Sequence, residues 1–298
     1  MSARTALSLL APFALLAGCA TPAPAPLADA TPAQQTWAAS CEDFDEWDKP
    51  GPAFRIYGNS YYVGTCGISA ILVARADGHV LIDSGTDEGA KVVLANIAAL
   101  GFDPADIDTI LMSHEHFDHV GGLARMQAAT GATIVATPEA AAVLRSGIPS
   151  ENDPQHLVGH PPFPVVTGAI ATNLPAAAPA GFTVIMTPGH TPGATSWRWQ
   201  ECEGGECRWL VYADSMNPIG ADAYRFSDHP ALLAAFRQGI ADMKASPCDI
   251  VMAPHPGAAN LRARLAGSAP LLDPDGCRAY AAGVEARLDT KLAEEAGG

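Results

Sequence analysis

Three histidines and one aspartate lie within a single run of six residues, His114-Glu115-His116-Phe117-Asp118-His119. Imidazole and carboxylate groups are costly to bury without partners, so packing alone does not account for this cluster. Neutral imidazole and carboxylate are ligands that suit zinc, and a catalytic zinc keeps one coordination position open for water. The run therefore predicts a zinc-binding site.

Two further histidines complete the expected ligand set. His190 lies in the segment 187–193 (TPGHTPG) and His255 in the segment 253–257 (APHPG), and each follows an expected strand. Proline and glycine on both sides make these loops stiff and sharply turned. Four ligands cannot complete two catalytic sites, so we expect both histidines to join the run 114–119. The remaining histidines have no partner motif and are expected to be ordinary surface or loop residues: His79, His156, His160 and His229.

Strands and helices that alternate along the chain must position these ligands. Short apolar or β-branched segments predict strands at 54–57, 60–63, 68–75, 79–83, 108–112, 132–136, 182–187, 194–200, 207–212 and 249–253. Helical spacing of apolar residues predicts helices at 88–99, 120–129, 138–146, 230–245, 258–266 and 276–295. Repeated strand–helix units predict an α/β protein in which helices cover sheets. Residues 147–165 are rich in proline and have no periodicity, which predicts a long loop of the kind that edges an active site.

The start of the chain has the layout of an export signal. Residues 1–18 combine a positively charged start, a short apolar middle and small residues at the exit, and the apolar stretch is well below the ~20 residues that span a bilayer. The sequence LAGC ending at Cys19 resembles a bacterial lipobox, which implies a lipid on Cys19; ordinary cleavage after Ala20 is the alternative. Residues 19–36, rich in Ala, Pro and Thr, are expected to be an extended tether, and residues 37–298 a single folded domain.

The composition excludes two broad classes of protein. Hydrophobic residues make up 48% of the chain, which is enough for a globular core and excludes disorder throughout. Seventeen Lys and Arg against 32 Asp and Glu give a formal charge of -15, which would repel nucleic acid. We therefore expect a periplasmic protein. Ala20, rather than aspartate, follows the lipid-bearing cysteine, and by resemblance to sorted lipoproteins this implies the outer membrane.

Six cysteines remain when Cys19 is set aside: Cys41, Cys66, Cys202, Cys207, Cys248 and Cys277. An even set in an exported protein predicts three disulfides. Many connectivities are possible, and proximity favours only Cys202–Cys207, across the turn of an expected hairpin. No CxxC spacing occurs in the sequence, so a zinc–cysteine cluster is not expected.

These motifs resemble those of the metallo-β-lactamase superfamily, whose signature HxHxDH follows a strand. The similarity extends across residues 54–257, and Asp83 in the segment LIDSG resembles the first motif of the family. Several stretches are similar to subclass B3 β-lactamases: GNSYYVGT (58–65), SHEHFDHVGG (113–122), TPGHTPGATSW (187–197), YADS (212–215) and PHPG (254–257).

The resemblance implies a fold, two metal sites and a set of disulfides. The implied fold is α/β, a four-layer αβ/βα sandwich with the metals at one edge. The implied cofactors are two Zn²⁺ ions, the first held by His114, His116 and His190 and the second by Asp118, His119 and His255. The implied disulfides are Cys41–Cys66, Cys202–Cys207 and Cys248–Cys277.

The implied activity is zinc-dependent hydrolysis of the β-lactam amide of penicillins, cephalosporins and carbapenems, which gives antibiotic resistance. A hydroxide shared by two zinc ions would attack the carbonyl, with Asp118 orienting it. No GxSxG or SxxK segment suggests a serine nucleophile. Ser215 would bind the substrate carboxylate together with Asn217, which stands where relatives often have a second serine. Gln155 is expected to line the cleft.

Two alternatives stay open. In lactonases and glyoxalase II-like thioesterases of the superfamily an aspartate in the YADS region bridges the metals, and Asp214 could do so here. A zinc-storage lipoprotein is a remote alternative, because such proteins use repeated histidine or acidic tracts. The expected partner is a small β-lactam substrate, with no nucleic acid, with membrane contact only through a lipid on Cys19, and with the chain acting as a monomer.

Overall fold

The computed structural model describes Met1 and residues 30–297, so the expected signal peptide and the lipid site at Cys19 lie outside the described residues. Seven strands form one sheet, in chain order: β1 (Phe54–Tyr57), β2 (Ser60–Tyr62), β3 (Ile71–Val73), β4 (His79–Ile82), β5 (Ile107–Leu111), β6 (Thr133–Val135) and β7 (Ile170–Ala171). Four strands form the second sheet in the order β11-β10-β9-β8: β8 (Thr183–Met186), β9 (Thr195–Glu203), β10 (Glu206–Tyr212) and β11 (Ile250–Met252).

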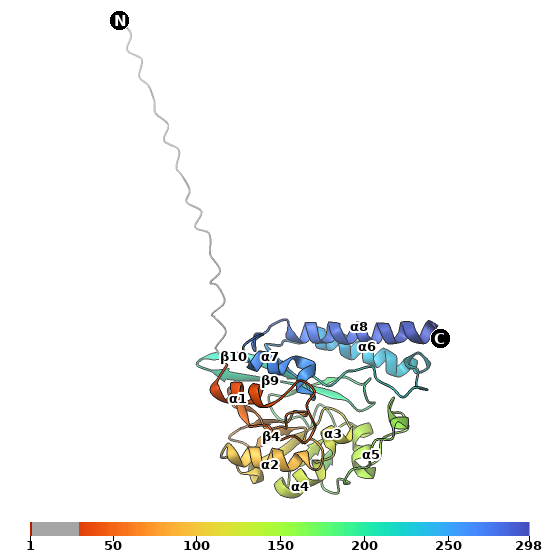
Figure 1. The fold of residues 1–298 in the computed structure, drawn as a ribbon, viewed down its shortest axis with the longest axis horizontal. Helices are drawn as coiled ribbons and strands as arrows, with labels where there is room; N and C mark the ends of the chain where they lie inside the picture. The colour runs from red at the N-terminus through yellow and green to blue at the C-terminus, as the bar shows by residue number, and fades with distance from the viewer. Residues whose placement is uncertain (2–29, 298) are drawn as a thin grey trace.

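Helices cover the outer faces of both sheets (Figure 1). The α-helices are α1 (Pro32–Ser40), α2 (Gly89–Ala99), α3 (Phe117–Val120), α4 (Leu123–Thr130), α5 (Pro138–Ser146), α6 (Pro230–Ala245), α7 (Leu261–Leu265) and α8 (Gly276–Gly297). Short 3₁₀ turns are η1 (Pro104–Asp106), η2 (His156–Val158), η3 (Phe226–Asp228) and η4 (Pro256–Ala259). Figure 1 shows α6 and α8 along one side and α2, α4 and α5 along the other, with the sheets between them. The fold is therefore the expected four-layer α/β sandwich.

The strands alternate between two cores because successive side chains point to opposite faces of a sheet. In β4, Val80 and Ile82 belong to the core between the sheets, whereas Leu81 belongs to the core beneath α2, α4 and α5. In β10, Tyr212 joins the core between the sheets and Val211 the core beneath α6 and α8. Strands buried on both faces are nearly continuous in apolar residues. This explains why they were visible as apolar runs in the sequence.

The tether expected at residues 19–36 is wrong for its last part, because residues 32–36 belong to the helix α1 and are not extended. Thr31 caps this helix: its side chain accepts from the Gln34 N–H, and the Gln34 side chain accepts from the Thr31 N–H, a reciprocal pair that stabilises a helix start. The Gln34 amide also donates to the Arg55 carbonyl (2.9 Å). Trp37 is fully buried in the core between the sheets, so the helix is held by packing as well as by its cap.

Three disulfides are present, with the pairings that the family resemblance implied: Cys41–Cys66, Cys202–Cys207 and Cys248–Cys277. The first joins the end of α1 to the segment after β2, and the second spans the β9–β10 hairpin. The third joins the segment before β11 to α8. Cys41 and Cys66 are buried in the core between the two sheets, whereas the other two disulfides lie within the part of the chain that carries the second sheet.

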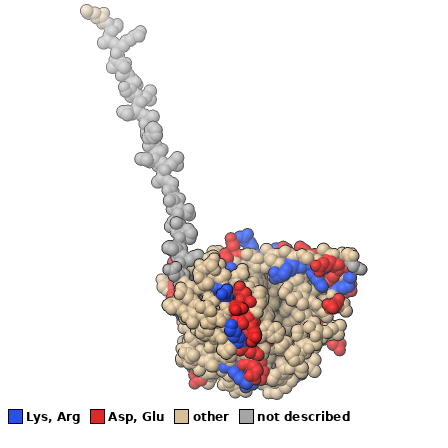
Figure 2. Space-filling view, in the orientation of Figure 1, with Lys and Arg blue, Asp and Glu red and all other residues tan. Residues whose placement is uncertain are grey.

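Charged side chains of both signs lie next to one another on the surface, as Figure 2 shows for one face.

Near the C-terminus, Glu295 of α8 accepts from the backbone N–H groups of Phe226 (2.8 Å) and Ser227 (2.9 Å). Burial opposes the charge of Glu295, but these hydrogen bonds outweigh it and lower the pKa of the carboxyl group. In the part of the chain that the structure describes, no helix has the length and apolar character needed to cross a bilayer.

Candidate metal centre

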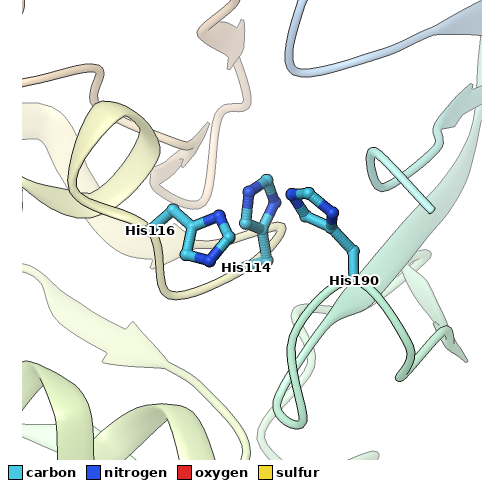
Figure 3. A group of neighbouring side chains, drawn as sticks. All are labelled: His114, His116 and His190. Atoms are coloured by element: carbon cyan, nitrogen blue, oxygen red, sulfur yellow. The ribbon is translucent and has the colours of Figure 1, made fainter. Parts of the chain in front are cut away.

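The six expected ligands gather into two groups of three at the edge where the two sheets meet. In each group the potential ligand atoms lie within 4.8 Å of one another: His114, His116 and His190 form the first group, and Asp118, His119 and His255 form the second group. Figure 3 shows His114 between His116 and His190, with the first two on one loop and His190 on another. The rings of His114 and His119 have centroids 4.3 Å apart, so the two groups are adjacent.

A hydrogen-bond network beneath the run 114–119 fixes the start of its loop. β5 ends at Leu111, and Ser113 then donates to the buried Asp83 carboxylate through its backbone N–H and its hydroxyl, both at 2.7 Å. Tyr212 donates to the same carboxylate at 2.8 Å. Asp83 has a φ of 59°, a left-handed conformation that is unusual for a residue other than glycine. This accounts structurally for the Asp83 motif.

Each histidine of the first group has one ring nitrogen close to a protein oxygen, as a hydrogen bond for His116 and His190 and as a close approach for His114. His114 Nδ1 lies 2.8 Å from Asp214 Oδ1, and His116 Nε2 lies 2.9 Å from Asp153 Oδ2. His190 Nδ1 lies 2.8 Å from the Asn217 carbonyl oxygen. In metal sites the outer nitrogen of a ligating histidine is almost always held in this way, which fixes the tautomer and the ring orientation. The other ring nitrogen of each histidine is then available to bind a metal together with the other two histidines of the first group.

The second group is built from a short helix and a distant loop. α3 begins at Phe117 and places Asp118 and His119 in its first turn, and His255 follows β11. Asp118 Oδ2 lies 3.0 Å from His119 Nε2 and 3.4 Å from His255 Nε2. A single carboxylate oxygen therefore faces two imidazole nitrogens.

Several buried nitrogens at this centre are suited to bind a cation. Among the described residues, His114 Nε2 and both ring nitrogens of His119 are buried without a hydrogen-bond partner. Leaving such groups unpaired is costly, and bound zinc would satisfy His114 Nε2 and one of the two nitrogens of His119. The donor set of five imidazoles and one carboxylate also suits zinc. The residues present therefore fit metal binding at this centre.

The pKa directions give neutral imidazoles in the first group and an ionised carboxylate in the second. Burial lowers the pKa of His190 to about 3, and burial with the neighbouring His119 lowers the pKa of His114 well below its usual value. Both rings are thus neutral, the form that ligates. Burial opposes the charge of Asp118, but the neighbouring His119 lowers the pKa of this carboxyl group well below its usual range, which keeps it ionised.

Asp214 lies outside both groups and points to the outer nitrogen of His114. Its other carboxylate oxygen accepts from the Met216 N–H at 2.9 Å, and burial raises its pKa well above the usual value. An aspartate that bridges two metals would have to join both groups. The observed position does not favour the bridging role considered for lactonases and thioesterases.

The expected substrate-binding residues are placed near the first group. The Ser215 hydroxyl is buried and has no hydrogen-bond partner among the described residues. Asn217 contacts the first group through its backbone carbonyl oxygen, which lies 2.8 Å from His190 Nδ1. Gln155 is buried, and its backbone N–H donates to Asp153 at 2.7 Å.

Sequence reasoning missed three side chains at this centre. Asp153 lies against His116, and its only signal was its place in the proline-rich loop. His160, expected to be an ordinary loop residue, has its ring centroid 5.1 Å from that of His116. Glu115, inside the metal-binding run, accepts from the Thr191 hydroxyl at 2.6 Å and from the Gly193 N–H at 2.8 Å, so it joins the two loops that carry the first group.

The fold and the paired ligand groups define the class of protein, and comparisons with known proteins agree. A family model described as the metallo-beta-lactamase superfamily matches residues 63–203. The solved structure of the MIM-2 metallo-beta-lactamase is 48% identical, with a TM-score of 0.82, over 90% of this chain and 100% of that one. The structure of MEM-A1, a subclass B3 metallo-beta-lactamase from a soil metagenome library, is 42% identical, with a TM-score of 0.77, over 85% of this chain and 99% of that one. This chain belongs to the metallo-β-lactamase superfamily.

The curated relatives are more distant. A hydroxyacylglutathione hydrolase from Anaeromyxobacter dehalogenans is 31% identical over 240 residues, which is 76% of this chain and 78% of that protein. Two other curated relatives match over only 58 and 68 residues, so this chain spans 13% and 22% of their lengths. These matches establish common ancestry and leave the substrate to be argued from the site.

Proposed function

We propose that this protein hydrolyses the amide bond of β-lactam antibiotics with two zinc ions held by the two groups, and so gives resistance to penicillins, cephalosporins and carbapenems. The observation that carries the proposal is the combination of two adjacent three-ligand groups with close likeness to solved metallo-β-lactamases over almost their entire length. Three protein ligands leave each ion a coordination position for a substrate or water, which favours catalysis over storage.

Each residue of the site has a separate role in the proposed reaction. Zinc held by these groups would supply Lewis acidity, which lowers the pKa of a water and polarises the substrate carbonyl oxygen. Asp118, ionised and facing the second group, would accept a hydrogen bond from the attacking water and orient it. Ser215, whose hydroxyl has no partner among residues 30–297, would donate to the substrate carboxylate, with the Asn217 side chain beside it. Gln155 would line the opposite side of the cleft.

A second candidate is hydrolysis of a glutathione thioester, which the relative from Anaeromyxobacter dehalogenans favours. The position of Asp214 argues against it, because its carboxylate supports His114 from outside the first group. The chain is also more similar in sequence to the MIM-2 metallo-beta-lactamase (48% identity) than to the hydroxyacylglutathione hydrolase (31% identity), which favours β-lactam hydrolysis.

The proposal also covers where the protein acts. We propose export through the signal 1–18, lipidation of Cys19 and anchoring at the outer membrane, with residues 37–298 as one domain that works as a monomer in the periplasm. Three disulfides suit such an oxidising compartment. Mass spectrometry of the membrane fraction would detect the lipid on Cys19, and a Cys19→Ala variant should appear in the soluble fraction.

The test of the activity uses the purified protein with a penicillin, a cephalosporin and a carbapenem, beside an acyl-homoserine lactone and a hydroxyacyl-glutathione thioester. We expect β-lactam hydrolysis that a chelator abolishes and added zinc restores. His116→Ala should lose this activity, whereas His229→Ala, at an exposed position outside both groups, should retain it. Hydrolysis of the lactone or the thioester alone would overturn the substrate assignment.

A further inference from the structure

Asp153 connects the loop 147–165 to the first group, and this pairing goes beyond the ligand set. The residue lies in a loop but is only 1% exposed. Its Oδ2 lies 2.9 Å from His116 Nε2, and its Oδ1 accepts from the Gln155 N–H at 2.7 Å. Both carboxylate oxygens are thus engaged, one by a metal-ligand candidate and one by the backbone of the expected substrate-binding residue.

The chemistry of the pair fixes which nitrogen of His116 is available. An ionised carboxylate only accepts hydrogen bonds, so His116 Nε2 must carry the hydrogen and Nδ1 must hold the lone pair. Nδ1 would therefore be the atom that ligates a metal. A histidine without this partner could adopt the other tautomer and other ring orientations, and loss of such an outer partner typically lowers metal affinity about 10–100-fold.

The backbone around Asp153 makes the link stiff. The Asp153 N–H donates to the Ser150 carbonyl at 3.0 Å, and the His156 N–H donates to the Asp153 carbonyl at 3.0 Å, which forms consecutive turns. The neighbouring Pro154 carbonyl accepts from the Ala221 N–H at 2.8 Å. The loop is thus held to the segment that follows Asn217 as well as to His116.

We propose that Asp153 is a positioning residue that couples the substrate-lining loop to the first metal ion: it orients His116 for ligation and holds Gln155 at the edge of the cleft. The inference rests on the proposed metal centre. It implies that metal at the first group and order in the loop 147–165 depend on the same carboxylate. Removal of this carboxylate should therefore change both, although the residue touches neither metal nor substrate.

Two substitutions separate this role from simple packing. Asp153→Ala removes both hydrogen bonds. Asp153→Asn keeps the size of the side chain but offers one acceptor and one donor group. If its oxygen faces Gln155, its NH₂ group faces His116 and favours the wrong tautomer; if it flips, the bond to Gln155 is lost. Glu151→Gln, at an exposed position in the same loop, is the matched control.

The experiment measures zinc affinity by competition with a chromogenic chelator, the visible absorption of the Co²⁺-loaded protein, and hydrogen–deuterium exchange of peptides from residues 147–165. For Asp153→Ala we expect first-site affinity about 10–100-fold weaker, an altered Co²⁺ spectrum and faster exchange in the loop. Asp153→Asn should show either the metal defect or the loop defect, and Glu151→Gln neither. Circular dichroism of the chelated proteins should show that both Asp153 variants are folded.

Two results would overturn the inference, and they differ. If the wild-type protein binds zinc and both Asp153 variants match it in affinity, spectrum and exchange, the positioning role is wrong while the metal centre stands. If the wild-type protein binds no zinc, the metal centre itself is wrong, and the proposed function fails with it.

Discussion

The bond between Glu115 and Thr191 should contribute measurably to the stability of the metal-free protein. Glu115 is 1% exposed, Thr191 is fully buried, and the two meet at 2.6 Å. Hydrogen bonds to charged groups contribute about 1.5–3 kcal/mol. Thr191→Val removes the hydroxyl with little change in volume, so we expect it to lower the free energy of unfolding by this amount.

A double-mutant cycle isolates the bond from other effects of the substitutions. Glu115→Ala also breaks the bond to the Gly193 N–H and removes a buried charge whose desolvation was unfavourable, so its own cost is not informative. The coupling energy between Glu115→Ala and Thr191→Val is informative. It should be about 1.5–3 kcal/mol. Each single substitution removes the shared hydrogen bond, so the sum of their two effects includes that bond twice, whereas the double variant loses it once.

The assay is urea unfolding in the presence of a chelator, so that metal binding does not contribute, with linear extrapolation to water. Buried Trp37, Trp197 and Trp199 provide a fluorescence signal for loss of the core. Thr36→Val is the control, because Thr36 is exposed and donates only within α1; it should change stability by no more than about 0.5 kcal/mol. A coupling energy near zero would refute the claim that this bond holds the two loops together.

Three further predictions follow from other parts of the structure. Gly189→Ala should destabilise the protein by about 1–3 kcal/mol in urea unfolding, because a Cβ there would lie 2.3 Å from the Phe236 ring at a φ of 153°; an unchanged midpoint would contradict this. Removing Cys248–Cys277, which closes 29 residues, should cost about 3.5 kcal/mol, against about 2 kcal/mol for Cys202–Cys207, which closes 5; the reverse order would refute the loop-entropy argument. Glu295→Gln should be less stable than wild type at pH 7, and the difference should close below about pH 4, since a carboxylate with a lowered pKa stabilises only while ionised; a difference that persists in acid would exclude the charge as its cause.

The sequence predicted the regular elements best where local signals mark both ends. The helix expected at 138–146 matches α5 in both bounds, because Thr137 supplies an N-cap and Gly147 a left-handed residue at the end. No helix was predicted at α1 (Pro32–Ser40), because the composition of residues 19–36, rich in Ala, Pro and Thr, indicates a tether. The short strand β7 was also missed, since two residues carry no periodicity.

The ligand candidates were predictable because each lies just after a strand, where the sheet edge brings loops together. The partners behind them were not predictable, for a physical reason. Asp153 and His116 are 37 residues apart, and Glu115 and Thr191 are 76 residues apart. An isolated acidic residue in a loop has no pattern that distinguishes a buried partner from a solvated side chain. Such pairs become visible only when the packing of both sheets is known.

The two ligand groups have a consequence for how the halves of the molecule stay joined. In each group two members follow β5 of the first sheet. The third member follows a strand of the second sheet, which is β8 for the first group and β11 for the second. Cys202–Cys207 and Cys248–Cys277 each join segments of the half that carries the second sheet, whereas ions in these groups would cross-link that half to the other. Ligands that bind only the native state shift the unfolding equilibrium in its favour. Chelation should therefore loosen the packing of one half against the other, whereas loss of Cys202–Cys207 and Cys248–Cys277 should weaken the second half alone.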